Sequence, residues 1–162
     1  MQAIEHVESH FARGGAREPV RNGVGRLMNK VIFACVRNAG RSLMAEAFFN
    51  VMVDPQKARA VSAGTQPGDK VHPEVLAAMR DIGIDLHDVK PRLLTDDLTQ
   101  DAQWLITLGC GEACPQVPGL QREDWPLEDP KDKSDVLVHR IRDELAARVA
   151  GLLEREGWMR AG

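Results

Sequence analysis

The sequence predicts an α/β domain built on a parallel sheet. Short apolar runs typical of buried strands alternate along the chain with segments whose apolar residues recur at helical spacing. The length of 162 residues corresponds to about one domain. A chain of this length buries roughly 68–70% of its unfolded surface, so it needs neither disulfides nor a metal to fold.

The first strong strand signal is the apolar run at residues 31–34, which is typical of a strand buried on both faces of a sheet. A polar turn at residues 35–42 follows this run. Beyond the turn, apolar residues at positions 43, 44, 47, 48 and 51 share one face of a helix that is expected to run to about Asp54. A strand, a turn and a helix are therefore predicted in succession.

The alternation continues to the C-terminus. Pro73 is placed to open a helix that Gly83 ends, Thr95 to cap a short helix and Ser134 to cap a long one. The other predicted elements are strands at residues 58–63, 104–108 and 120–125, the last at an edge of the sheet.

Residues 1–28 are expected to form an N-terminal extension to a domain of residues 29–162. Scattered glycines and a proline interrupt the extension, and it shows no sustained apolar face. We expect this segment to be flexible or partly helical, with residues 2–12 as the helical candidate.

The composition excludes several classes of function. The chain carries 21 Lys and Arg against 24 Asp and Glu, a net charge of −3, whereas proteins that bind nucleic acids or anionic membranes concentrate positive charge. No apolar run approaches the ~20 residues that cross a bilayer, and no signal-peptide pattern stands at the start. We therefore expect a cytoplasmic monomer with neither nucleic-acid nor membrane partners. In that reducing compartment its three cysteines are expected to be catalytic, redox-active or plain buried thiols rather than a disulfide framework.

The turn at residues 35–42, with the sequence CVRNAGRS, carries the strongest functional signal, and we call it the anion loop. Cys35 stands at the carboxyl end of the first strand, where ligands bind in open α/β sheets. The backbone N–H groups of a loop that leads into a helix can form a site for an oxyanion. The candidate substrate-binding residues are accordingly Val36, Arg37, Asn38, Ala39, Gly40, Arg41 and Ser42.

Individual residues of the anion loop have separate expected roles. Arg41 can clamp two oxygens of an anion with its planar guanidinium. Asn38 and Gly40 tolerate the left-handed backbone conformations that a tight loop requires. Cys35, surrounded by donors, is expected to ionise and act as a nucleophile, with the Ser42 hydroxyl orienting its sulfur. The alternative is that Cys35 is only a small buried apolar residue, but the flanking strand and helix favour the catalytic interpretation.

The stretch VIFACVRNAGRSLMAEAFF at residues 31–49 resembles the phosphate-binding loop and first helix of the low-molecular-weight protein tyrosine phosphatase fold. It resembles more closely the arsenate reductases built on that fold. Further similarity lies in SAGT at 62–65, LITLGCGEACP at 105–115 and EDWPLEDP at 123–130. The resemblance implies a four-stranded parallel sheet in the order 2-1-3-4 with helices on both faces.

The resemblance also implies a relay of three cysteines. Cys35 would attack arsenate held by the anion loop and Arg41, and Asp129 would protonate the departing oxygen. Cys110 would then attack the Cys35 adduct, which releases arsenite and leaves a Cys35–Cys110 disulfide. Cys114 would attack Cys110, free Cys35 and leave a Cys110–Cys114 disulfide for an external reductant.

The spacing of Cys110 and Cys114 bears on the electron donor. Thioredoxin-coupled members of the family separate these two cysteines by a longer stretch. The short spacing here is similar to that of members that use mycothiol. The expected partner is therefore thioredoxin, or a mycothiol- or bacillithiol-type thiol with its redoxin.

We expect no bound cofactor. Glu46 and Ser62 match positions that help to hold a potassium ion under the loop in some members of the family. Arg92, however, stands where those members have an acidic residue, and Lys90 can itself supply a positive charge. No histidine stands at a ligand spacing to the cysteines. We therefore predict no bound metal.

Arsenate reduction for arsenic detoxification is the function that the sequence favours, and two alternatives remain open. A low-molecular-weight tyrosine phosphatase would use only Cys35, Arg41 and Asp129 to hydrolyse aryl phosphates. Phosphatases of this fold commonly place tyrosines just after the acidic residue, whereas Lys131 follows Asp129-Pro130 here and the chain has no tyrosine. The second alternative is a non-catalytic module that binds an oxyanion or senses redox state.

Overall fold

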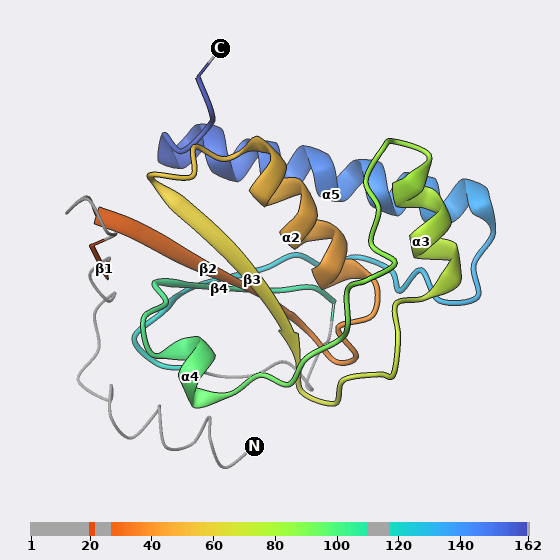
Figure 1. The fold of residues 1–162 in the computed structure, drawn as a ribbon, viewed down its shortest axis with the longest axis horizontal. Coiled ribbons are helices and arrows are strands. Elements are labelled where there is room, and N and C mark those ends of the chain that lie inside the picture. The colour runs from red at the N-terminus through yellow and green to blue at the C-terminus, as the bar shows by residue number, and fades with distance from the viewer. Residues whose placement is uncertain (1–19, 22–26, 110–116, 162) are drawn as a thin grey trace.

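In the computed structural model, the described residues (20–21, 27–109 and 117–161) form a sheet with helices on both of its faces (Figure 1). The helix expected at residues 2–12 lies outside this part of the chain. In chain order the elements are β1 Val20–Arg21, β2 Leu27–Cys35, α2 Arg41–Met52, β3 Ala58–Gly64, α3 Pro73–Arg80, α4 Asp96–Thr99, β4 Trp104–Thr107, β5 Gln121–Asp124 and α5 Asp135–Glu156.

Four strands run parallel in the order β3-β2-β4-β5. Counted along the chain from β2, this is the order 2-1-3-4, so the expected fold is confirmed. In addition, β1 pairs antiparallel with the start of β2, with Val20 opposite Met28. β2 begins before the apolar run at residues 31–34 because the polar residues Asn29 and Lys30 also pair with β3.

The register of the strands brings their carboxyl ends to one edge of the sheet. Cys35 at the end of β2 lies opposite Gly64 at the end of β3, and Ala34 lies opposite Thr107 at the end of β4. This edge is where ligands bind in open parallel sheets. The fold therefore positions the anion loop as the sequence predicts.

The alternating side chains of β2 separate two apolar cores. Val31, Phe33 and Cys35 belong to the larger core with residues of α2, α3 and α5, and Ile32 and Ala34 belong to the smaller core on the opposite face. In Figure 1 the three longer helices lie on one side of the sheet and α4 lies on the other. All five of these side chains are at most 3% exposed. The continuous apolar run is thus explained by burial on both faces.

Aromatic side chains make a continuous series of contacts through the larger core. Trp104 packs edge-on against Trp158, which contacts Phe49. Phe33 in turn contacts both Phe49 and Trp125. The ring centroids are 5.7–6.2 Å apart, a range in which tilted and edge-to-face pairs attract one another. Trp104 and Trp125 are both buried in this core.

The helix starts follow the predicted caps. The Thr95 and Ser134 hydroxyls accept hydrogen bonds from the backbone N–H groups of Leu98 and Leu137, at 3.4 and 3.3 Å. α3 begins at Pro73 as expected, but it ends at Arg80 rather than at Gly83. Gly83, with a φ of 85°, lies in the turn that follows the helix.

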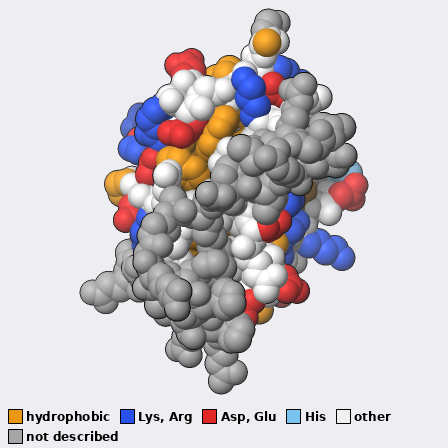
Figure 2. All heavy atoms as spheres, turned by 90° about the vertical axis from the view of Figure 1, so that its left-hand side faces the viewer, with side chains coloured by type: hydrophobic (Ala, Val, Ile, Leu, Met, Phe, Trp, Pro, Cys, Tyr) orange, Lys and Arg blue, Asp and Glu red, His pale blue; other side chains and the backbone are white. Residues whose placement is uncertain are grey.

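The described surface shows no segregation of charge on the face drawn in Figure 2. Acidic and basic side chains are interspersed there, as suits a net charge of −3. Exposed large apolar side chains, such as Val51 on α2 and Val136 on α5, lie on separate elements. No helix in the described ranges combines the length and apolar character needed to cross a bilayer.

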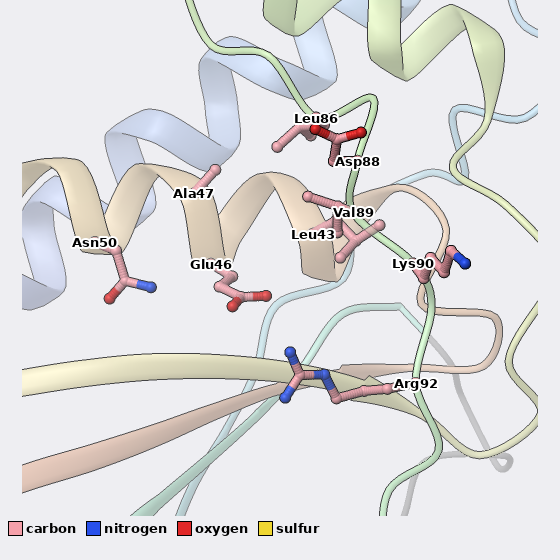
Figure 3. Close-up of a pocket in the computed structure, with 9 residues that line it drawn as sticks. All are labelled: Leu43, Glu46, Ala47, Asn50, Leu86, Asp88, Val89, Lys90 and Arg92. Atoms are coloured by element: carbon pink, nitrogen blue, oxygen red, sulfur yellow. The ribbon is translucent and has the colours of Figure 1, made fainter.

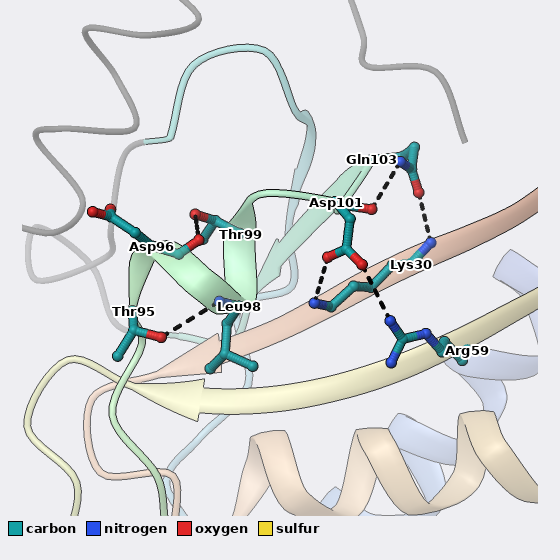
Figure 4. A network of polar contacts seen from close by, with 8 residues as sticks. All are labelled: Lys30, Arg59, Thr95, Asp96, Leu98, Thr99, Asp101 and Gln103. Atoms are coloured by element: carbon teal, nitrogen blue, oxygen red, sulfur yellow. Dashed lines mark hydrogen bonds and ion pairs between the residues drawn. The ribbon is translucent and has the colours of Figure 1, made fainter. Parts of the chain in front are cut away.

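An ion pair ties the start of β2 to the segment before β4 (Figure 4). Lys30 is 4% exposed, its Nζ lies 2.8 Å from Asp101 Oδ1, and its backbone N–H donates to Gln103 Oε1 at 2.7 Å. Arg59 approaches the other Asp101 oxygen at 3.3 Å. Burial opposes the ionisation of Asp101, but the hydrogen bond and charge of Lys30 outweigh it and hold the pKa of Asp101 below its usual value.

Replacing Asp101 with Asn is expected to lower the free energy of unfolding by about 1–3 kcal/mol at pH 7, because it leaves the buried Lys30 ammonium without its counter-charge. The pKa of Asp101 is lower in the folded chain than in the unfolded one. Its contribution is therefore present above the unfolded value of about 3.9 and is lost as the pH falls through the folded value. Urea unfolding followed by circular dichroism, at neutral pH and in acid, measures both effects.

The matched control for this ion pair is Arg59→Gln, which removes a half-exposed partner of the same carboxylate. It should cost less than about 1 kcal/mol. Equal losses from the two substitutions would contradict the importance assigned to the buried ammonium.

Candidate active site

The anion loop presents its carbonyl groups to the segment that follows β3. The carbonyl oxygens of Val36, Arg37 and Ala39 accept hydrogen bonds at 2.8–2.9 Å from backbone N–H groups within residues 65–72. Because the C=O and N–H of one trans peptide unit point in opposite directions, the N–H groups of these units point away from that segment. The loop thus acquires the polarity that an anion requires.

Cys35, the last residue of β2, has a free thiol and is 3% exposed. Its sulfur lies 2.9 Å from Ser42 Oγ at the start of α2. The sulfur also accepts a hydrogen bond from the backbone N–H of Asn38 at 3.2 Å. These two contacts fix the sulfur at the base of the anion loop.

Asn38 holds the loop from behind. Its side chain is completely buried, and its amide nitrogen donates to Ser42 Oγ at 2.7 Å. Its Oδ1 accepts a hydrogen bond from the backbone N–H of Arg92 at 2.9 Å. The φ of Asn38 is 50°, in the left-handed region that the sequence predicts and that asparagine tolerates. Asn38 therefore connects the segment before α4 to the serine that contacts Cys35.

Two glycines allow other segments to close around the loop. The expectation of a left-handed backbone at Gly40 is wrong, because its φ is −150°. Its lack of a Cβ eases packing instead, since a Cβ would make tight contacts with Pro130 Cγ at 3.1 Å and His72 Cδ2 at 3.2 Å. A Cβ at Gly64 would lie 2.5 Å from the carbonyl oxygen of Val36. Gly64 is therefore required by close approach to backbone, and neither glycine is required by a positive φ.

Arg41 begins α2, and its side chain is 11% exposed. Its Nη1 donates to the carbonyl oxygen of Leu127 at 2.9 Å and approaches that of Gly109 at 3.4 Å. Its Nη2 lies 3.8 Å from Asp129 Oδ2. Gly109 has a φ of 69°, and a Cβ there would lie 2.4 Å from the Leu127 oxygen and 2.5 Å from Arg41 Nη1. The guanidinium is thus held in place by backbone that only glycine can form.

A cavity of about 240 Å³ opens at the Cys35 sulfur and brings these groups together. Its volume is ample for a tetrahedral oxyanion. Asn38 and Ser42 do not line the cavity but support the sulfur from behind. The lining residues are Cys35, Val36, Arg37, Ala39, Gly40, Arg41, His72, Gly109 and Asp129.

Cys110 and Cys114, the other predicted catalytic residues, lie outside the described residues. Gly109, which immediately precedes Cys110, lines the cavity. Asp129 reaches the cavity with a half-exposed carboxyl group, one oxygen of which accepts the backbone N–H of Lys131 at 3.0 Å.

Three contributors to the site are not predicted from the sequence. Gly109 could have been found, because a glycine directly after a predicted strand lies at the same edge of the sheet as Cys35. His72 contacts the loop through its backbone N–H, which donates to Ala39. Leu127 acts through its carbonyl oxygen. The residue types at these positions do not predict either backbone contact.

A second, larger cavity of about 500 Å³ lies between α2 and the segment that precedes α4 (Figure 3). Glu46 and Arg92 face each other there, and Lys90 also lines the space. Burial raises the pKa of Glu46, although the hydrogen bond from the Ser62 hydroxyl and the charge of Arg92 act against that shift. Because Cys35 does not line this cavity, the smaller one is the candidate active site.

Gly109→Ala is expected to weaken the binding of inorganic phosphate at least about tenfold, because the added methyl group would displace the Arg41 guanidinium. Isothermal titration calorimetry with phosphate measures the affinity, and a parallel urea unfolding curve shows that the variant is folded. The control is Gly151→Ala on α5, where a Cβ meets nothing within 4 Å. That variant should keep its affinity and gain about 0.5–1 kcal/mol of stability. An unchanged phosphate affinity in Gly109→Ala would show that Arg41 does not hold the anion.

Comparison with known proteins agrees with this geometry. The glutaredoxin arsenate reductase of Synechocystis sp. is 34% identical over 131 residues, which cover 79% of this chain and 98% of that protein. The structure of the thioredoxin-dependent arsenate reductase of Corynebacterium glutamicum matches with a TM-score of 0.67 and 32% identity, over 95% of this chain and 68% of that one. A structure of an arsenate reductase in the phosphate-binding state matches with a TM-score of 0.69 and 33% identity, over 79% and 98% of the two chains.

The family described as low molecular weight phosphotyrosine protein phosphatase matches residues 30–157. This range contains the anion loop, Arg41, Asp129 and all four parallel strands but for the first residues of β2. The chain therefore belongs to the low-molecular-weight phosphotyrosine protein phosphatase family.

Proposed function

We propose that this protein reduces arsenate to arsenite with a relay of cysteine thiols. One observation carries the proposal: a buried thiol and a nearly buried arginine line a cavity of oxyanion size, in a chain whose relatives above 30% identity are named arsenate reductases. The proposal rests on the site rather than on the fold, because one fold hosts different chemistries.

In the proposed first step, arsenate enters the cavity at Cys35. Backbone N–H groups of the anion loop and the Arg41 guanidinium would hold its oxygens. The sulfur would attack arsenic, and one oxygen would leave as water after it accepts a proton. We assign that proton to Asp129, whose carboxyl group lines the same cavity.

Cys110 supplies the second thiol in this proposal. Its thiolate would attack the Cys35 sulfur, and the S–As bond would break. The electron pair of that bond reduces arsenic from As(V) to As(III), which leaves as arsenite. The remaining Cys35–Cys110 disulfide would exchange with Cys114, which restores the Cys35 thiol. The position of Gly109 supports this order, because the residue immediately before Cys110 lines the cavity.

The Cys110–Cys114 disulfide would be reduced by an external thiol donor. The names of two relatives point to glutaredoxin and to thioredoxin. The short spacing of the two cysteines keeps a mycothiol- or bacillithiol-type thiol with its redoxin in the proposal. Such a cycle requires a reducing compartment, so we assign the protein to the cytoplasm. Within one chain the proposed relay needs no second subunit, and we therefore propose that the protein acts as a monomer.

The catalytic unit in this proposal is residues 29–162, with residues 1–28 as an extension whose strand β1 and residues Leu27 and Met28 pair at the edge of the same sheet. The family match, which begins at residue 30, supports that boundary. The comparisons favour arsenate reduction over the phosphatase alternative, because the relatives above 30% identity carry the arsenate reductase name. The lack of any tyrosine also removes the aromatic contacts expected for an aryl phosphate.

Cysteine substitutions are expected to have graded effects on the arsenite formed per molecule of protein. Cys35→Ser and Cys110→Ser should form none, whereas Cys114→Ser should form about one equivalent and then stop as the Cys35–Cys110 disulfide. Chromatographic separation of arsenite from arsenate, with thioredoxin, glutaredoxin or a small thiol as donor in separate reactions, measures the yield. Hydrolysis of an aryl phosphate is the control, and Cys110→Ser should leave it unchanged.

Two outcomes would overturn this mechanism. Continued arsenate turnover by Cys110→Ser would remove that residue from the relay. A wild-type protein that hydrolyses aryl phosphates efficiently but forms no arsenite with any donor would be a phosphatase.

A further inference from the structure

A third cavity, distinct from the one between α2 and the segment that precedes α4, adjoins the cavity at Cys35. Its volume is about 420 Å³. It is lined by residues of three stretches of chain: Arg37 and Ala39 of the anion loop, Gly68, Asp69, Lys70 and His72 after β3, and Asp129 and Lys131 after β5. Arg37, His72 and Asp129 also line the cavity at Cys35, so the two spaces are contiguous. We call this third cavity the entry groove.

The entry groove has a small excess of positive charge in a chain that is acidic overall, because Arg37, Lys70 and Lys131 outnumber the carboxylates of Asp69 and Asp129. The side chains of Arg37, Lys70 and Lys131 are exposed, and within the described ranges none of them has a carboxylate oxygen at ion-pair distance. The Asp129 carboxylate is already engaged by the Lys131 backbone N–H and by Arg41. Three cations that are not paired therefore border a groove in a molecule whose net charge is −3.

Cations that form no ion pair within the described part of the protein can attract an anionic ligand. An anion feels their field within about 10 Å at 0.1 M salt, and an excess of positive charge along a groove raises the local concentration of the anion. Within the described residues, no aromatic side chain lines the groove. It therefore suits a small inorganic oxyanion better than an aryl ester, which would require an apolar platform.

We propose that the entry groove is an anion-capture site, in which Lys70 and Lys131 attract arsenate from solution and direct it past Arg37 into the cavity at Cys35. The identity of the anion rests on the proposed function. The two lysines determine how readily the anion is captured and take no part in the chemistry, so their removal should raise KM and leave kcat unchanged.

The test compares Lys70→Gln, Lys131→Gln and the double variant with wild type. Each single substitution should raise KM for arsenate by about two- to threefold at low salt, and the double variant by about five- to tenfold. The differences should largely vanish at about 0.5 M salt, where the field is screened. The matched control is Lys133→Gln, which removes the same charge from an exposed lysine close in sequence that does not line the groove. Its KM should stay within about 1.5-fold of wild type.

Three results would each overturn the capture site: a fall in kcat at constant KM, an equal effect from Lys133→Gln, or a KM ratio that does not change with salt. The dissociation constant of inorganic phosphate, measured by calorimetry for all the variants, separates this proposal from the proposed function. If wild type forms no arsenite, the proposed function fails, while equal phosphate affinities in wild type and the double variant would reject the groove on their own.

Discussion

The shape of the anion loop depends on the two hydrogen bonds of the Asn38 side chain. Its carboxamide joins the backbone of Arg92 to the hydroxyl of Ser42, and that hydroxyl contacts the Cys35 sulfur. The positive φ of Asn38 turns the chain so that carbonyls of the loop meet the segment after β3. Burial of the Asn38 side chain carries little free-energy penalty, because the nitrogen and the oxygen of its amide both make hydrogen bonds. The Asn38 side chain thereby links the turn of the loop to the serine beside the nucleophile.

The start of β2 contributes to stability, and its end contributes to the candidate site. At its start, Lys30 pairs with Asp101 and fixes the strand to the segment before β4. At its end, Cys35 borders a cavity whose walls come from four separate stretches of chain. Stabilising contacts and reactive groups are thus separated along one strand. This arrangement leaves the carboxyl edge of the sheet open for loops that bind and react.

The sequence predicted the features that depend on neighbouring residues and missed the contacts between residues far apart in the chain. Apolar runs and caps located the strands and the helix starts, because those signals lie within a few residues of each other. The strand order came from the resemblance, since alternation alone does not say which strands are neighbours. The Lys30–Asp101 pair joins residues far apart in the chain, and a lysine near the start of a strand has no pattern that marks it as buried. For the same reason the short pairing of β1 with β2 was not expected.

The candidate site shows the same limit. Arg41 and Asp129 were expected beside Cys35, and both line its cavity, while the roles assigned to them, to Cys110 and to Cys114 stay predictions. A left-handed backbone was expected at Gly40 and is not found. The sequence does not distinguish a glycine that allows close packing from one that adopts a positive φ. Gly109 combines both reasons, and only its neighbours in three dimensions reveal them.

The buried aromatic series gives the protein an optical probe of its own. With three tryptophans and no tyrosine, its ultraviolet emission comes from indole alone. Trp104 and Trp158 contact each other, whereas Trp125 contacts Phe33 and stands two residues before Leu127, the acceptor of the Arg41 guanidinium. A change in emission when an oxyanion is added would therefore originate chiefly at Trp125, and unfolding would expose all three indoles together.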